Sequence, residues 1–98
     1  MKRLKNIHPG EVLLEDFLKP LGISQYRLAM ACELPHSRVT DIIKGRRGIS
    51  ADTALRLAKA LGTSADLWLG LQRDFDLEEA SRENAKTYRS IPLLAQAA

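Results

Sequence analysis

Apolar residues recur at the three- and four-residue spacing of an amphipathic helix along most of this chain, in short segments separated by Gly, Pro or a capping Ser. The first segment starts at Pro9 and is stopped by Pro20 and Gly22. The second follows Ser24 as its N-cap and ends near Cys32. Both segments are short and have one apolar face, so they need a shared core.

Three more helices are predicted further along the chain. Pro35 holds the residue before it in an extended conformation, so a third helix spans residues 36–44. A fourth helix follows Ser50 and a fifth follows Ser64, each a good N-cap. Residues 76–88 continue the helical pattern with fewer apolar positions. The result is five or six short helices with short connections, which indicates an all-α domain.

Length and composition support one small helical domain. The chain has 98 residues, enough for a single core, and 45% of them are apolar, with Leu and Ala prominent. We therefore expect an N-terminal arm (1–8), a helical domain (9–76) and a C-terminal extension with a tail (77–98). Since no run of about 18 apolar residues is present, the chain is expected to be soluble and cytoplasmic.

Enzyme and cofactor chemistry are not indicated. Cys32 is the only cysteine, which excludes an intrachain disulfide and a cysteine-based zinc site, and its position predicts a buried thiol. His8 and His36 are too far apart in sequence for a convincing metal pair. No grouping of nucleophile, base and acid is evident, and no Gly-rich phosphate loop follows a strand. We expect neither catalysis nor a cofactor.

The charge is uneven. Residues 1–50 carry nine Lys or Arg against five Asp or Glu, a balance of +4, while residues 51–98 carry six against seven, a balance of −1. Such an asymmetry points to a polyanion that binds the first half, although a solvated basic surface accounts for it equally well.

The second and third predicted helices, joined by a tight turn, have the form of a helix-turn-helix. Small Ala29 lets them cross closely, and Val39 and Ile42 turn inward. The other face of the third helix is polar and, in this architecture, enters the DNA major groove. The predicted base contacts are His36, Ser37, Arg38, Thr40 and Asp41.

Neighbouring cationic and polar residues are suited to the DNA backbone, because they bind phosphate whatever the base sequence. The predicted phosphate contacts are Gln25, Tyr26, Lys44, Arg46 and Arg47.

The polar residues of the third helix are also compatible with a plain solvated surface. Arg38 fits such a face, and small Ser37 and Thr40 need no partner. Asp41 repels phosphate and can pair with Arg38 or Lys44.

An apolar group in the less basic half is a candidate dimer interface. The group consists of Trp68, Leu71, Phe75 and Leu77. The alternative is that these side chains form the core that a chain of this size needs, which is the preferred interpretation for Trp68.

Two long motifs, "HPGEVLLEDFLKPLGIS" and "LPHSRVTDIIKGRRGISADTALRLAKALGTSADLWLGLQRDFDL", resemble the HigA/VapI antitoxins of the lambda-repressor-like (XRE) helix-turn-helix group. The resemblance covers about four-fifths of the chain. It implies an all-α, lambda-repressor-like helix-turn-helix bundle of five helices plus a C-terminal helical extension. It also implies a homodimer on palindromic operator DNA, repression of its own operon, and partnership with a HigB-like toxin of the RelE-like ribonuclease class. It also implies that the helix from His36 to Lys44 reads DNA and that Gln25 contacts phosphate.

Two other functions fit the sequence: a free-standing XRE-type repressor without a toxin, and a protein-binding toxin inhibitor with secondary DNA contact. One position departs from the common pattern, since Glu33 stands where many helix-turn-helix proteins have Gly. The turn therefore either places Glu33 in a left-handed conformation or uses a different geometry.

Overall fold

Residues 9–21 form one continuous helical segment made of three pieces, in a computed structural model that describes residues 5–95. The pieces are α1 (Pro9–Val12), the π-helical η1 (Leu13–Leu18) and α2 (Lys19–Leu21). The segment stops at Pro20 and Gly22 as predicted, with Pro20 inside the last short piece that follows the π-helical η1. The helix ends at Gly22, whose φ of 67° is left-handed.

The helix-turn-helix consists of α3 (Gln25–Cys32) and α4 (His36–Ile43). The Ser24 hydroxyl accepts a hydrogen bond from the Arg27 N–H at 3.0 Å, as expected of the N-cap. In the turn, Glu33 adopts φ 55° and ψ 46°, which is the left-handed alternative predicted for it. The two helices therefore cross with a turn of ordinary helix-turn-helix form although no glycine is present.

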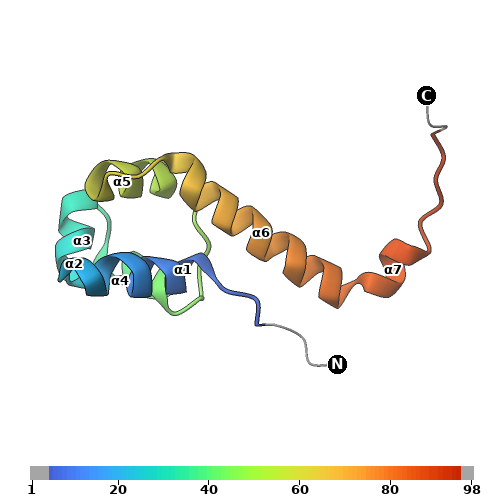
Figure 1. The fold of residues 1–98 in the computed structure, drawn as a ribbon, viewed down its shortest axis with the longest axis horizontal. Helices are drawn as coiled ribbons and strands as arrows, with labels where there is room; N and C mark the ends of the chain where they lie inside the picture. Colours follow the sequence, from blue (N-terminus) through green and yellow to red (C-terminus); the bar gives the residue numbers. More distant parts are fainter. Residues whose placement is uncertain (1–4, 96–98) are drawn as a thin grey trace.

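The second half of the chain forms α5 (Ala51–Leu61), α6 (Ala65–Glu83) and α7 (Ala85–Arg89). Helix α6 leaves the body formed by the earlier helices and carries α7 at its far end (Figure 1). It has 19 residues and passes without a break through the expected domain boundary after residue 76. None of the helices within residues 5–95 is long and apolar enough to cross a membrane.

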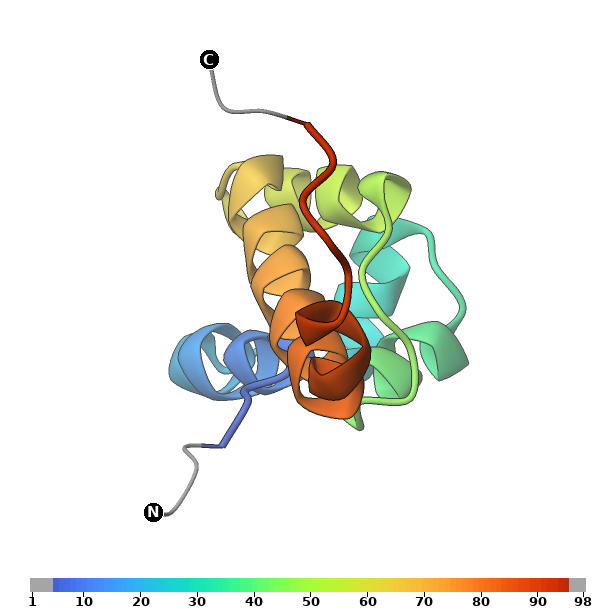
Figure 2. The same ribbon diagram turned by 90° about the vertical axis from the view of Figure 1, so that its right-hand side faces the viewer.

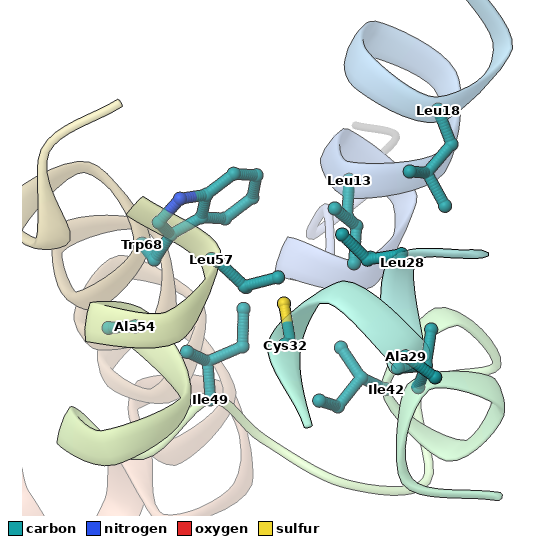
Figure 3. Close-up of a cluster of buried hydrophobic side chains, with 11 residues drawn as sticks. Leu13, Leu18, Leu28, Ala29, Cys32, Ile42, Ile49, Ala54, Leu57 and Trp68 are labelled. Atoms are coloured by element: carbon teal, nitrogen blue, oxygen red, sulfur yellow. The ribbon is translucent and has the colours of Figure 1, made fainter. Parts of the chain in front are cut away.

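The core is assembled from η1, α3, α4, α5, α6 and the loop before α5 (Figure 3). Cys32 is buried in it as predicted, and burial raises the pKa of its thiol. The buried apolar residues are Leu13, Leu18, Leu28, Ala29, Cys32, Val39, Ile42, Ile49, Ala54, Leu57 and Trp68.

Trp68 is fully buried in this core and corrects one expectation. Its side chain is 0% exposed, and its indole N–H donates a hydrogen bond to the Thr63 hydroxyl at 2.8 Å. A residue without exposed surface cannot contact a second chain, so its assignment to a dimer interface was wrong and the core alternative was correct. Leu71 and Phe75 are half-buried, while Leu77 is 61% exposed.

The N-terminal segment is held against α6 and α4. The Asn6 amide donates to the Phe75 carbonyl at 3.0 Å. Gly10 lies so close to α4 that a Cβ atom on it would overlap the Ile42 carbonyl oxygen. The first turn of α1 therefore fixes the position of α4 from the core side. Residues 1–4 of the expected arm and residues 96–98 of the expected tail lie outside the described residues.

Candidate nucleic-acid interface

Helix α4 has one buried and one open face. Val39 and Ile42 are each 1% exposed, which fixes the rotation of the helix about its axis. On the opposite side the predicted base contacts remain accessible, since none of them is buried by the described chain: His36 and Ser37 are exposed, and Arg38, Thr40 and Asp41 are half-exposed. The open face is thus available to a ligand as large as duplex DNA.

The N-terminus of α3 is tied to this open face. The Thr40 hydroxyl donates a hydrogen bond to the Gln25 side-chain oxygen at 3.2 Å. That bond leaves the Gln25 amide hydrogens for another acceptor. Beside it, the rings of Tyr26 and His36 meet edge-on with centroids 5.9 Å apart. Two residues expected to contact phosphate are therefore in direct contact with two expected to reach bases, a pairing that the sequence did not predict.

Asp41 pairs with a residue other than the two predicted. Its Oδ1 accepts from Arg46 Nε at 3.1 Å and Nη2 at 2.9 Å, and neither Arg38 nor Lys44 pairs with it. The backbone N–H of Arg46 also donates to the Asp41 carbonyl at 2.8 Å. The helix turns back at its C-terminus, which brings residue 46 nearer than spacing along a straight helix suggests. In residues 5–95, exposed Lys44 and Arg47 form no ion pair.

Arg56 on α5 forms hydrogen bonds with the turn between α3 and α4. Its Nη1 donates to the Cys32 carbonyl at 2.8 Å and to the Glu33 carbonyl at 3.3 Å, while its Nε binds the Asp52 carboxylate at 2.9 Å. A cation at the C-terminus of α3 satisfies carbonyls that have no partner within the helix. Sequence reasoning missed this role. The only signal was the Asp52–Arg56 spacing, which is typical of an ordinary pair along one helix.

His8 caps α1 with its ring rather than with a hydroxyl. Its Nδ1 accepts a hydrogen bond from the Gly10 N–H at 2.9 Å, and its ring meets Phe75 edge-on at 4.8 Å. Burial lowers the pKa of His8 below its usual 6.5, against weaker opposing effects of the Asp76 and Glu11 carboxylates. His8 is therefore the N-cap of α1.

Acidification is expected to destabilise the protein through His8. Because its folded pKa is lowered, the unfolded chain binds more protons than the folded chain just below pH 6.5. The contribution of His8 is therefore complete above its usual pKa and declines as the pH falls from about 6.5 toward the folded value. Urea unfolding at a series of pH values measures this decline. His8→Asn keeps a capping acceptor without titrating, so an equal decline in that variant would refute the assignment.

A helix-turn-helix family model matches residues 14–68, more than half of the chain. The chain belongs to the helix-turn-helix family. This membership, with the structural likenesses below, confirms the predicted all-α helix-turn-helix fold and the resemblance to HigA and VapI antitoxins. The family is one of DNA-binding regulators rather than enzymes, in agreement with the sequence prediction.

Three relatives illustrate how much of the chain the similarity covers. Virulence-associated protein I of Dichelobacter nodosus is 44% identical over 93% of this chain and 84% of its own length. The structure of Pseudomonas aeruginosa antitoxin HigA with the higBA promoter is 40% identical, with a TM-score of 0.87 over 93% of this chain and all of that one. Antitoxin GraA in complex with its operator is 38% identical, with a TM-score of 0.87 over 98% of each chain.

Proposed function

We propose that this helix-turn-helix protein is an antitoxin that binds the operator of its own operon. The observation that carries the proposal is the open polar face of α4, from His36 to Asp41, beside Lys44 and Arg47, which have no ion-pair partner within residues 5–95. The side chains from His36 to Asp41 have donors and acceptors for base edges, and Lys44 and Arg47 have positive charges for phosphate. Two structural relatives that match nearly the whole chain are complexes with DNA, a promoter in one and an operator in the other.

The antitoxin acts as a homodimer on a palindromic site. One short recognition helix reads only a few base pairs, and a two-fold dimer places two such helices about 34 Å apart on one side of the duplex. Leu77, exposed on the outer half of α6, and the half-buried Leu71 and Phe75 remain the candidate interface. All three lie on α6, the helix whose outer half projects from the body (Figure 1). Trp68 is not part of this interface, because it is buried in the core.

The toxin partner is a RelE-like ribonuclease of the HigB kind, and the site of action is the cytoplasm. Support for the toxin comes from the similarity to an antitoxin named HigA over its full length. Co-purification of the chain with the product of an adjacent short, basic reading frame tests it. The absence of such a gene would favour the free-standing repressor.

Footprinting on the DNA upstream of the gene tests the operator proposal. Protection of two inverted half-sites about 10 base pairs apart, centre to centre, is the expected result. A single unpaired protected site would contradict the dimer. Uniform protection of all DNA would contradict specific recognition.

Arg38→Ala is expected to weaken operator binding by about 5- to 150-fold, corresponding to about 1–3 kcal/mol for one bidentate base contact. Binding to unrelated DNA should change much less. Arg47→Ala is the matched control, because it should weaken binding to every sequence and reduce the slope of log K against log salt by about one. Fluorescence anisotropy at several salt concentrations measures both. If the two variants behave alike on operator and unrelated DNA, the division into base and phosphate contacts is wrong.

A further inference from the structure

The loop between α4 and α5 carries Arg46 and Arg47 and is fixed from a distant helix. Gln72 on α6 accepts a hydrogen bond through its side-chain oxygen from the backbone N–H of Ile49 at 2.8 Å. Ile49 itself is buried in the core at 4% exposure. Figure 2 shows the loop running from α4 to α5 beside α6. Ile49 therefore holds the end of the loop nearest α5 in two ways, through its backbone N–H and through its buried side chain.

A second bond fixes the orientation of the Gln72 amide. Its nitrogen donates to the Asp76 carboxylate at 2.9 Å, one helical turn further along α6. A carboxylate accepts and cannot donate, so the amide nitrogen faces Asp76 and the oxygen faces Ile49. The Gln72 oxygen is therefore already oriented toward the Ile49 N–H.

Gly48 shows how closely the loop approaches α6. A Cβ atom at this position would lie 3.0 Å from the carbon, nitrogen and oxygen of the Gln72 amide. The φ of Gly48 is not in the left-handed region, so its backbone angles do not demand glycine. A methyl group here would require the Gln72 amide to shift from its two hydrogen bonds, so the loop and this amide are packed closely together.

The other end of the loop is anchored independently by the two contacts between Arg46 and Asp41 described above. Arg47 lies between the two anchors. It is exposed and forms no ion pair among the described residues. A cation of this kind on a loop fastened at both ends is held ready for an anion before that anion arrives, which reduces the ordering cost of binding.

We propose that Gln72 is a positioning residue for DNA binding, which acts by holding the 46–49 loop so that Arg47 meets the phosphate backbone. Gln72 touches no DNA itself. This inference rests on the proposed function. It gives α6 a part in DNA binding, although the helix lies outside the helix-turn-helix.

Gln72→Met tests the inference, because methionine keeps the length and the helix propensity of the side chain but accepts no strong hydrogen bond. Amide hydrogen exchange at Ile49 should become faster without DNA. Affinity for operator DNA should fall by about 3- to 10-fold, the factor that one lost hydrogen bond carries. In an Arg47→Ala background the same substitution should have little further effect on affinity, since the loop has then lost the cation that it positions.

The charge-neutral exchange of Gln72→Glu with Asp76→Asn is the matched control. Glutamate still accepts from the Ile49 N–H, and the asparagine amide now donates to the glutamate. This double variant should restore both Ile49 protection and operator affinity. Chemical unfolding of each variant separates a local effect on the loop from a global loss of stability.

Each outcome has a distinct meaning. If Gln72→Met leaves Ile49 exchange unchanged, or weakens binding as strongly without Arg47 as with it, the positioning role is refuted while operator binding stands. If the unmodified protein binds no upstream DNA although Ile49 is protected, the proposed function fails and this inference fails with it.

Discussion

Replacing Trp68 with alanine is expected to lower the free energy of unfolding by about 3–5 kcal/mol, the cost of deleting a fully buried large aromatic side chain. The indole packs among the buried side chains of the core (Figure 3). Its ring centroid lies 5.1 Å from that of Phe17. Its loss leaves a cavity and removes the hydrogen bond that the indole N–H donates to the Thr63 hydroxyl. Small domains have only about 5–15 kcal/mol of stability, so we expect a much lower urea midpoint and DNA binding lost at ordinary temperature.

Two milder variants separate packing from hydrogen bonding at this site. Thr63→Val removes the acceptor of the indole N–H and should cost about 1–3 kcal/mol, because a buried donor is left without a partner. Trp68→Phe keeps most of the apolar volume and should fall between Thr63→Val and the alanine variant. A Trp68→Ala protein with an unchanged urea midpoint would show that the core does not depend on the indole.

Gly10→Ala is expected to have the second-largest effect. Its new methyl group would overlap the Ile42 carbonyl and press on the Ile43 backbone, neither of which can rotate away as a flexible side chain would. Overpacking of this kind costs about 1–3 kcal/mol and sometimes more, and a clash with backbone belongs at the upper end. Because α4 must shift to relieve it, operator affinity should fall even under conditions where the variant remains folded.

Gly70→Ala is the control for that substitution. At Gly70 the nearest neighbour of a new Cβ is the mobile end of Arg73 at 3.7 Å, so there is room for the methyl group. Alanine inside a helix is favoured over glycine by about 1 kcal/mol, and this variant should be as stable as the parent or more so. Circular dichroism melts and anisotropy measure the pair. Equal behaviour of the two variants would contradict the close contact between α1 and α4.

Features with local causes were predictable from the sequence. The caps Ser24, Ser50 and Ser64 each accept a bond from a backbone N–H three residues later, and such bonds depend only on neighbours in the chain. The open face of α4 followed from helical periodicity for the same reason. The end of the first segment at Pro20 and Gly22 was predictable in the same way, whereas its π-helical piece was not, because a π turn has no recognised pattern of residues.

Features that depend on tertiary approach were beyond a single sequence. Trp68 is apolar, and an apolar residue on a helix serves a core and an interface equally well, so periodicity alone does not separate the two. Arg56 and Gln72 look like ordinary polar residues of α5 and α6. Their partners are backbone groups of Cys32 and Ile49, 24 and 23 positions away, and these come within reach only after the helices pack.

The unbroken α6 sets a rule for how this chain tolerates changes in length. Each added or deleted residue in a helix swings everything beyond it by about 100° around the axis. An insertion or deletion between Trp68 and Gln72 would turn the Gln72 amide away from the 46–49 loop or move the Trp68 indole out of the core. An insertion or deletion after Leu77 would move neither the Trp68 indole nor the Gln72 amide. We therefore expect α6 to tolerate changes in length only in its outer part.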